Sequence, residues 1–458
     1  MPNSPIPPNV TLERAAETGW RRKAGMVSLP EVHRSVVVPG QGSFWRKMAA
    51  FAGPGFLVAV GYMDPGNWAT DLSGGAQFGY TLLAVVLISN FMAILLQHLC
   101  VKLGIATGRD LAQACRDHYS TPTIWFLWVI CELAIAACDL AEVIGSAIAL
   151  QLLFHIPLIW GVCITALDVL LILFLENKGF RYIEAIVVTL VATIGLCFSL
   201  EIFFSRPELA GIFSSLFIPS REILHDREML YIAIGILGAT VMPHNLYLHS
   251  AVVQTRDFDR TPEGKREAIK YCNIDSAVAL TFALLVNAAI LIVSAATFYR
   301  SGNHQVAEIG DAYKLLSPLL GVTGASTIFA LALLASGQNS TLTGTLAGQI
   351  IMEGFLNLRV KPWLRRLITR LIAIIPTVIV TAYWGESGTA QLIIFSQVIL
   401  SFQLSFAVFP LVMFTSSKLK MGEFVNPVWI KGLAWTAAVL IASLNAWLLV
   451  QTVREWMA

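Results

Sequence analysis

Two apolar segments of the chain are interrupted near their centres by residues that could bind a metal ion. The first break reads Asp-Pro-Gly-Asn at positions 64–67, and the second reads Met-Pro-His-Asn at positions 242–245. Proline and glycine release backbone groups from helical hydrogen bonds, and lipid offers these groups no partner. Carboxylate and amide oxygens together with a thioether suit a divalent transition metal, because magnesium and calcium prefer oxygen ligands alone. The breaks therefore predict a site for such an ion.

At the first break, the side chains of Asp64 and Asn67 are the candidate oxygen ligands. The two residues lie three positions apart, so both oxygens can converge from one turn of helix. Opening the backbone at Pro65 and Gly66 also frees carbonyl groups, such as that of Gly61, to turn toward a cation. The alternative is a structural kink in which Asp64 only caps the half-helix that follows.

At the second break, Met242 is the candidate sulfur ligand. A methionine in an apolar segment usually fills a gap in the core, but the position beside Pro243 favours a ligand. His244 could be a metal ligand, a proton carrier or a hydrogen-bonded core residue. Its place at the break favours a role in proton movement.

Three carboxylates in the apolar segment 123–153 form a second candidate site. Glu132, Asp139 and Glu142 are spaced so that they fall along one stripe of a helix. Carboxylates inside a membrane face a water-filled cavity or a cationic partner. Arg366 and Arg370 lie one turn apart at the start of a later apolar segment and are candidate partners. We expect these groups to form a static salt-bridge network, a proton path, or both.

Two later apolar segments also carry polar side chains. Gln338, Thr341, Thr345 and Gln349 follow helical spacing in the segment 318–356. This stripe favours helix packing and a lining of the pathway over a set of direct ligands. In the segment 389–416, Gln397 could lend an amide oxygen to the metal.

The composition is that of an integral membrane protein. Of the 458 residues, 56% are hydrophobic and only 13% are charged. A membrane-spanning helix needs about 20 mostly apolar residues. Eleven segments meet this need: 50–75, 80–104, 123–153, 158–176, 182–204, 229–253, 273–298, 318–356, 367–385, 389–416 and 429–451. The predicted fold is therefore all-α and integral to the membrane, with about eleven transmembrane helices.

The distribution of positive charge predicts the orientation. Of the 31 lysine and arginine residues, 25 lie in the N-terminal tail and in alternate loops, and six lie elsewhere. Positive residues concentrate on the cytoplasmic side of membrane proteins. We therefore expect a multi-pass protein of the cell membrane with its N-terminus in the cytoplasm and its C-terminus outside. Residues 1–47 are expected to form a disordered cytoplasmic tail, and residues 48–458 a single transmembrane domain.

The two breaks occupy corresponding places in two groups of five spans. The first group covers about 48–205 and the second about 227–416, while the span near 429–451 stands outside both. Because five is odd, the second group must be inserted upside down relative to the first. Paired broken helices in an inverted repeat mark the binding site of a secondary transporter.

Several other functions find no support in the sequence. No combination of residues indicates catalysis, so we do not expect an enzyme. No Walker-type phosphate loop is present, so no nucleotide is expected. The near-neutral net charge of +2 gives no reason to expect nucleic-acid binding. Divalent metal ions, protons and the lipid bilayer are the expected partners.

The two breaks and the run from 337 to 349 resemble the Nramp family, the natural resistance-associated macrophage proteins. The likeness extends from about residue 45 to residue 450. It implies a LeuT-like fold of inverted repeats with broken first and sixth helices. It also implies proton-coupled uptake of manganese or ferrous iron into the cytoplasm, with the metal as substrate and no cofactor.

The resemblance also implies roles for individual residues. Asp64, Asn67 and Met242 would bind the metal through their side chains. The carbonyls of Gly61 and Ala239 would join them in some states, and Gln397 matches a glutamine of the family's tenth span. The proton and salt-bridge network would comprise Asp64, His244, Glu132, Asp139, Glu142, Arg366 and Arg370.

Three alternatives differ from this interpretation. The first is a symporter of amino acids or other organic solutes on the same fold, although a central aspartate would repel a substrate carboxylate. The second is a passive metal channel, which would carry large currents without dependence on protons. The third is a metal sensor, which would bind without transport.

Overall fold

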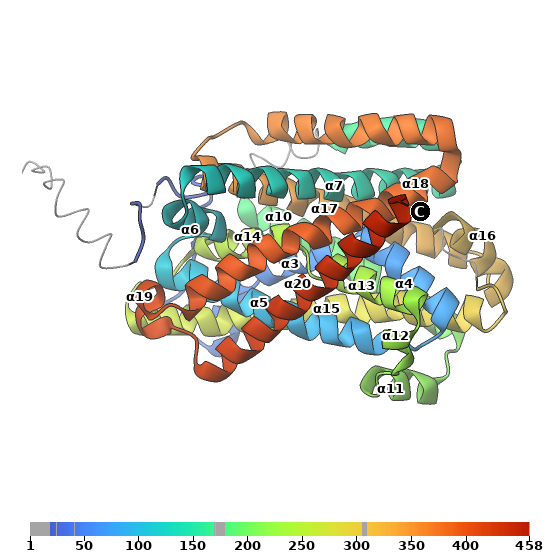
Figure 1. Cartoon of the computed structure of the whole chain (residues 1–458), viewed down its shortest axis with the longest axis horizontal. Coiled ribbons are helices and arrows are strands. Elements are labelled where there is room, and N and C mark those ends of the chain that lie inside the picture. Colours follow the sequence, from blue (N-terminus) through green and yellow to red (C-terminus); the bar gives the residue numbers. More distant parts are fainter. Residues whose placement is uncertain are drawn as a thin grey trace, which may run out of the picture.

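The structure is built almost entirely from helices (Figure 1). The computed structural model describes residues 19–23, 25–40, 42–168, 170, 179–304 and 309–457. The first half contains β1 (Val36–Val37), α2 (Phe44–Phe51), α3 (Pro54–Ala59), the 3₁₀-helix η1 (Val60–Met63), α4 (Pro65–Phe78), α5 (Leu83–Thr107), α6 (Leu111–His118), α7 (Thr121–Phe154), α8 (Leu158–Ile164), the 3₁₀-helix η2 (Thr165–Leu167) and α10 (Phe180–Ser205).

Two short helices, α11 (Leu209–Phe217) and α12 (Glu222–His225), lead to the second half. That half contains α13 (Arg227–Thr240), α14 (Pro243–Val252), the 3₁₀-helix η3 (Val253–Thr255), β2 (Arg256–Asp257), α15 (Pro262–Ser294), the π-helix η4 (Ala295–Tyr299), α16 (Ile309–Leu320), α17 (Ala325–Leu356), α18 (Pro362–Ser416), α19 (Lys418–Met421), the 3₁₀-helix η5 (Gly422–Phe424) and α20 (Val428–Met457).

The predicted spans coincide with these helices. Eight helical segments in the described part of the chain are long and apolar enough to cross a membrane. α18 holds two of them, because the backbone at Gly385 leaves the helical region with φ 65° and ψ −150°. The shorter apolar helices Pro54–Met63 and Leu158–Leu167 belong to the first and fourth predicted spans, and α17 belongs to the eighth. The all-α membrane fold is confirmed, although residues 171–176 of the fourth span lie outside the described residues.

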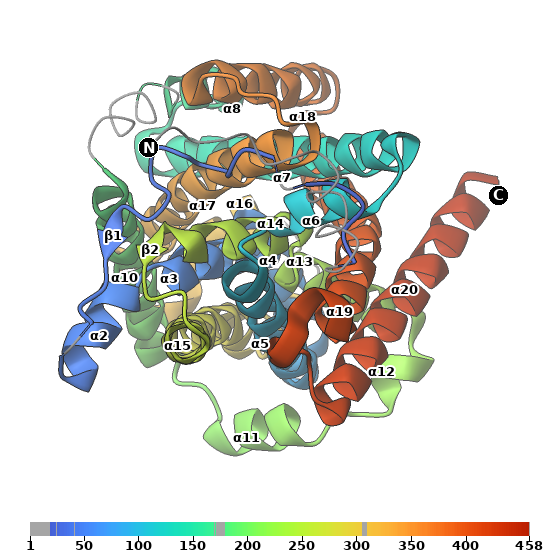
Figure 2. The ribbon, with the colours of Figure 1, turned by 90° about the vertical axis from the view of Figure 1, so that its left-hand side faces the viewer.

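The two broken helices lie near the middle of the molecule (Figure 2). The first consists of α3, η1 and α4, and the second of α13 and α14. α13 contacts α4, and α14 contacts α3. The first half of each broken helix therefore faces the second half of the other, as an inverted repeat requires.

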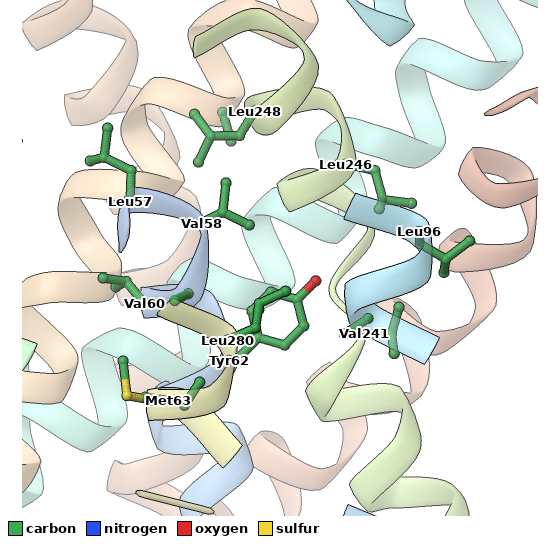
Figure 3. Packing of buried hydrophobic residues seen from close by; sticks show 14 of the residues in the cluster. Leu57, Val58, Val60, Tyr62, Met63, Leu96, Val241, Leu246, Leu248 and Leu280 are labelled. Atoms are coloured by element: carbon green, nitrogen blue, oxygen red, sulfur yellow. The ribbon is translucent and has the colours of Figure 1, made fainter. Parts of the chain in front are cut away.

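Long helices enclose the broken pair. α7 contacts both α17 and α18, and Figure 2 shows these three helices together along one side of the molecule. α15 contacts α3, α4 and α5, which closes another side. Apolar side chains of the first broken helix pack against those of α5, α14 and α15 (Figure 3). They include Leu57, Val58, Val60, Tyr62, Met63, Leu96, Leu246, Leu248 and Leu280.

Three of the loops that were predicted to lie on the cytoplasmic side are joined by side-chain contacts. The Nζ atom of Lys265 donates to the carbonyl of Ala106 at 2.9 Å, and Arg266 forms an ion pair with Glu423. These contacts join the loops after the second, sixth and tenth predicted spans. We call this side of the molecule the basic face.

Residues 19–23 and 25–40 contact the basic face, which differs from the disordered tail that the sequence predicted. Only 3% of the surface of Trp20 is exposed. The ammonium nitrogen of Lys420 lies 3.8 Å from the ring centroid, the guanidinium carbon of Arg109 lies 4.8 Å from it, and Phe414 meets the ring edge-on. Residues 1–18 lie outside the described residues.

Further along, the same segment makes specific polar contacts. The Ser28 hydroxyl donates to Asp110 Oδ2 at 2.5 Å, and the backbone N–H of Leu29 donates to Glu353 at 2.8 Å. The strands β1 and β2 then pair in parallel. Burial raises the pKa of Asp110 to about 6, while the Ser28 hydroxyl opposes that shift. These contacts join residues far apart in the chain, so the polar composition of the tail did not reveal them.

Candidate metal-binding site

At the first break, one helix ends and another begins at Asp64. Asp64 has extended backbone angles (φ −70°, ψ 166°), and Pro65 occupies the first position of α4, where its missing N–H leaves no hydrogen bond unmade. Asp64 Oδ1 accepts a hydrogen bond from the backbone N–H of Asn67 at 2.9 Å. Asp64 Oδ2 is buried and has no partner among the described residues. One oxygen therefore caps α4, as the alternative interpretation proposed, and the other is available to a cation.

Asn67 links the two breaks. Its Nδ2 atom donates to Asp64 Oδ1 at 2.6 Å and to the carbonyl of Ala239 at 3.0 Å. Its Oδ1 atom accepts a hydrogen bond from Asn287 Nδ2 at 3.4 Å. Asn67 and Ala239 are separated by 172 positions in the chain. The fold thus places the backbone of the second break directly beside the side chains of the first.

Other helices satisfy some of the carbonyl groups that the first break releases. The carbonyl of Met63 accepts hydrogen bonds from the Trp68 indole at 3.2 Å and from the Ser336 hydroxyl. The carbonyl of Tyr62 accepts one from Asn287 Nδ2 at 2.8 Å. α15 and α17 therefore support the open backbone that the break requires.

Two glycines allow amide side chains to approach the first break. A Cβ atom on Gly61 would lie 2.1 Å from Asn245 Nδ2, and one on Gly66 would lie 2.1 Å from Gln397 Nε2. Gln397 Oε1 and both polar side-chain atoms of Asn245 are buried without partners among the described residues. The structure therefore brings Gln397 to the break, as predicted. Asn245 was not predicted, although it holds the same place in the second motif as Asn67 in the first.

Met242 lies at the second break, in the interior of the protein. It caps α14 with extended backbone angles (φ −77°, ψ 126°), and Pro243 follows at the first helical position. The Met242 side chain is completely buried and packs with Ala134, Cys138 and Leu400. Its thioether is thus held between α7 and α18 rather than facing lipid.

Two histidines of α14 occupy the core near the breaks. His244 is buried, and its Nδ1 atom has no partner among the described residues. His249 Nδ1 lies 2.9 Å from Gln97 Oε1, and Gln97 Nε2 donates to the Tyr62 hydroxyl at 2.8 Å. The contacts from His249 through Gln97 to Tyr62 join α14 to the first broken helix by way of α5. The sequence assigned no role to His249.

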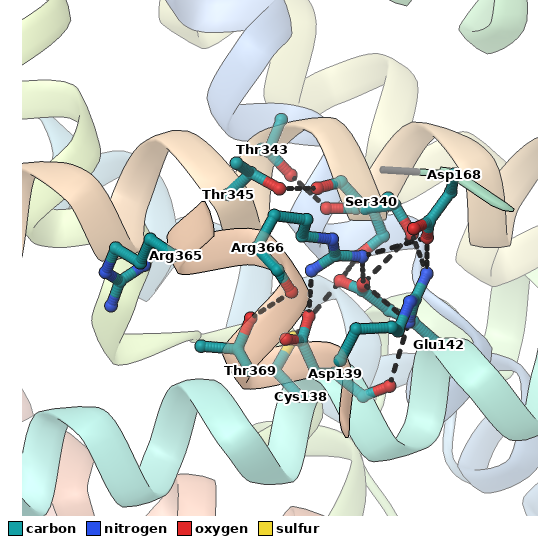
Figure 4. A network of polar contacts seen from close by, with 12 residues as sticks. Cys138, Asp139, Glu142, Asp168, Ser340, Thr343, Thr345, Arg365, Arg366 and Thr369 are labelled. Atoms are coloured by element: carbon teal, nitrogen blue, oxygen red, sulfur yellow. Dashed lines mark hydrogen bonds and ion pairs between the residues drawn. The ribbon is translucent and has the colours of Figure 1, made fainter. Parts of the chain in front are cut away.

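The second candidate site is a buried cluster of charges between α7 and α18 (Figure 4). Arg366 contacts Asp139, and its Nη2 atom lies 3.4 Å from Glu142 Oε2. Arg370 Nη1 lies 4.0 Å from the same Glu142 oxygen. The Ser340 hydroxyl donates to Glu142 Oε1 at 2.7 Å. The predicted pairing of these carboxylates with these arginines is therefore present in the structure.

Asp168 is a member of this cluster that sequence reasoning missed. Its Oδ2 atom lies 3.2 Å from Arg366 Nη2 and contacts Arg370. The sequence contained a feature that could have identified Asp168. A carboxylate within the apolar segment 158–176 is as unusual as those in the segment 123–153. We refer to Asp139, Glu142, Asp168, Arg366 and Arg370 as the charge cluster.

Glu132 lies on α7 with the other two carboxylates but forms a separate pair. Its Oε2 atom lies 2.7 Å from Arg365 Nη2, and its side chain is 24% exposed. Among the described residues, no ion pair joins Glu132 to Arg366 or Arg370. The predicted stripe on α7 is thus divided into an outlying pair and the charge cluster.

The groups at the two breaks are candidate ligands of a kind that would suit an ion that must be bound and then released. In the described part of the chain, no three His, Cys, Asp or Glu side chains gather as a metal site. The breaks instead offer one carboxylate, several amides, a thioether and open backbone. One carboxylate only partly compensates the charge of a divalent ion, so the site can bind the ion without trapping it.

Comparison with known proteins identifies relatives over nearly the whole chain. Residues 55–451 match a family model described as natural resistance-associated macrophage protein-like. The chain is 69% identical over 430 residues to a divalent metal cation transporter, MntH, of Nostoc sp., covering 94% of this chain and 97% of the relative. A protein of the same name from Listeria monocytogenes is 64% identical over 436 residues, covering 95% of this chain and 97% of the relative.

Solved structures of other transporters have a similar fold. The manganese transporter of Eremococcus coleocola matches with a TM-score of 0.86 and 44% identity, covering 92% of this chain and 90% of the other. Mhp1, a nucleobase-cation-symport-1 family transporter, matches with a TM-score of 0.57 and 14% identity, covering 86% and 88%. This second likeness concerns the fold alone and agrees with the expected LeuT-like arrangement.

Proposed function

Because this chain belongs to the Nramp family, we propose that it is a secondary transporter that carries Mn²⁺ and/or Fe²⁺ into the cytoplasm together with protons. Divalent metal transport is supported by the relatives from Nostoc and Listeria, which are named divalent metal cation transporters. The structurally similar Eremococcus protein is a manganese transporter. The metal is a transported substrate, and the chain is a multi-pass membrane protein.

The observation that carries the proposal is the hydrogen bond from Asn67 Nδ2 to the Ala239 carbonyl. The same nitrogen also donates to Asp64 Oδ1. A positively polarised N–H group thus lies between two oxygens, one from each broken helix. A divalent cation that displaced this group would bridge the same two oxygens.

Each proposed ligand contributes a distinct property. Asp64 supplies the negative charge that offsets dehydration of the cation. Asn67 and Gln397 supply neutral amide oxygens, and Met242 supplies a soft sulfur that favours Mn²⁺, Fe²⁺ or Cd²⁺ over Mg²⁺ and Ca²⁺. The carbonyls of Gly61 and Ala239 join in those states of the transport cycle in which the breaks open toward the ion.

The proton is proposed to leave the metal site through α7. Asp64 and His244 lie at the two breaks, and α14, which carries His244, contacts α7. The series of titratable and charged groups continues with Asp139, Glu142, Arg366 and Arg370. Glu132 lies further along α7, where it pairs with Arg365 of α18. Burial favours the protonated form of these carboxylates and the neighbouring arginines favour the ionised form, and this balance is suited to reversible protonation.

We place the basic face in the cytoplasm and the C-terminus outside. The excess of lysine and arginine in the loops of the basic face supports this orientation. The metal would then enter from the opposite face and leave through the basic face.

An uptake panel in proteoliposomes tests the proposal. Purified protein would be reconstituted, and uptake of Mg²⁺, Ca²⁺, Mn²⁺, Fe²⁺ and Cd²⁺ would be measured with and without an inward proton gradient. We expect Mn²⁺, Fe²⁺ and Cd²⁺ to enter, and the gradient to accelerate their entry. Large currents without dependence on the gradient would instead indicate a passive channel. Displacement of bound metal by an amino acid would favour an organic-solute symporter.

A further inference from the structure

We propose that Asp168 is the residue that enables the charge cluster to hold a proton. The inference rests on the proton coupling described under the proposed function and extends it to a residue on the fourth span. Asp168 acts on Arg366 and Arg370 rather than on the metal, so it is a positioning residue for the transport reaction.

The charge cluster is buried. The exposed fraction of the side chain is 2% or less for every member of the charge cluster: Asp139, Glu142, Asp168, Arg366 and Arg370. In such an environment an uncompensated charge is strongly disfavoured, so the cluster as a whole must be close to neutral.

The charge cluster contains more carboxylates than arginines. Three carboxylates face two guanidinium groups, and arginine does not release its proton in proteins. With all groups ionised the cluster carries one net negative charge, and a single bound proton neutralises it. Without Asp168 the two remaining carboxylates would balance the two arginines, and the cluster would have no reason to take up a proton.

In the part of the chain that the structure describes, the groups around the cluster do not change this count. Glu132 and Arg365 form their own neutral pair on α7 and α18. Cys138 Sγ lies 3.6 Å from Glu142 Oε1 as a thiol donor. His244 on α14 and Asp64, the N-cap of α4, are further titratable groups, and both of these helices contact α7. Within the described ranges, no ion pair connects either of them to the cluster.

The charge cluster also contains carboxylate oxygens to which a proton can bind. Asp168 Oδ1 and Asp139 Oδ2 are buried and have no partner in the described part of the chain. Both oxygens of Glu142 already accept hydroxyl hydrogen bonds, one from Ser340 at 2.7 Å and one from Thr341 at 3.1 Å. A proton can therefore bind at either aspartate without breaking an existing contact, and it belongs to the coupled cluster rather than to one residue.

Asp168→Asn tests the inference, because it removes the third negative charge and keeps the shape of the side chain. Metal uptake and proton entry would be measured together in sealed proteoliposomes over a series of external pH values. We expect Mn²⁺ uptake to persist, metal-driven proton entry to be lost, and uptake to become independent of external pH. Asp168→Glu should retain both the proton entry and the pH dependence of the parent.

A double variant separates charge number from local structure. Asp168→Asn combined with Arg370→Gln leaves two carboxylates and one arginine, which restores one net negative charge. We expect this variant to regain pH-dependent uptake that Asp168→Asn lacks. If Asp168→Asn fails to fold, the double variant and Asp168→Glu still report on the inference, because both preserve the negative charge of the cluster and should remain pH-dependent.

Glu201→Gln is the matched control. Glu201 is a completely buried carboxylate on α10, outside the charge cluster, and neither of its oxygens has a partner among the described residues. Its substitution should leave the ratio of protons to metal unchanged. If the parent couples metal to protons and Asp168→Asn does so equally, the role of Asp168 is refuted while the proposed function stands. If the parent itself shows no proton entry, the coupling in the proposed function fails.

Discussion

The guanidinium group of Arg256 is completely buried, and its Nη1 atom lies 2.7 Å from Glu184 Oε1. Its Nη2 atom donates to the carbonyl of Ala52 at 2.6 Å, and Arg181 donates to the same carbonyl at 2.7 Å. Arg256 follows the second broken helix, Glu184 and Arg181 lie at the start of α10, and Ala52 precedes the first broken helix. These contacts therefore tie three elements together on the basic face.

Arg256→Ala is expected to loosen the basic face. Breaking a buried ion pair costs about 3 kcal/mol, so amide hydrogen exchange in α2 and α3 should accelerate by about tenfold or more. Hydrogen–deuterium exchange in detergent or nanodiscs measures this change. Arg266→Ala is the control, because Arg266 is 61% exposed in its pair with Glu423, and such pairs contribute little. Equal exchange in the two variants would contradict the assignment of Arg256.

Asp64→Ala should abolish metal transport while leaving the protein folded. The variant removes the charged ligand of the first break, and its loss should weaken Mn²⁺ binding by about 100-fold or more. Binding to the purified variant and uptake in proteoliposomes would be compared with the parent at equal thermal stability. Normal Mn²⁺ uptake by a folded Asp64→Ala protein would remove this residue from the site.

Met242→Ala should change selectivity more than it lowers transport. Sulfur contributes little to binding of hard ions, so Ca²⁺ and Mg²⁺ should compete better with Mn²⁺, and Cd²⁺ uptake should decline most. Met63→Ala is a matched control, because the Met63 side chain packs in the apolar cluster around the first broken helix (Figure 3). Superimposable competition profiles for Met242→Ala and the parent would show that the thioether does not select the metal.

Asp139→Asn should keep metal binding and lose metal-driven proton entry. The substitution removes one carboxylate from the charge cluster but leaves every proposed metal ligand in place. Simultaneous recording of metal and proton flux in sealed vesicles measures the effect. An unchanged number of protons per metal, at normal protein levels, would reduce Asp139 to a structural partner of Arg366.

The burial of Asp110 predicts a pH dependence of stability. Burial raises the pKa of Asp110 from 3.8 to about 6, so the folded state favours the protonated carboxyl. The corresponding stability is present below the lower pKa and is lost as the pH rises through the upper one, by an amount on the order of 3 kcal/mol.

Asp110→Asn removes this titration and keeps the helix cap, because asparagine also caps helices. We expect the midpoint of thermal unfolding of the parent to decline relative to that of Asp110→Asn as the pH rises from about 4 to about 6. Scanning fluorimetry of the two proteins over this range makes the comparison. Parallel curves would contradict the shifted pKa of Asp110.

The sequence by itself determined the membrane class, the spans and the kinds of side chain at the breaks. Apolar runs and helical spacing are local properties, so eleven spans could be predicted from the order of residues alone. Proline and glycine at 65–66 and proline at 243 also act locally, because each opens the backbone of its own helix. Asp64, Asn67 and Met242 could be chosen for the same reason, since their chemistry does not depend on which residues they meet.

Only the tertiary structure decided which of these groups lie together. The contact between Asn67 and Ala239 bridges 172 positions, and the place of Asp168 between two arginines of α18 depends on how the fourth and ninth spans pack. Trp20 likewise required a pocket formed by residues from α18, α19 and the loop before α6. Such contacts depend on the crossing of helices that are distant in the chain, and helical periodicity shows only which face of a helix is polar, not which helix it meets.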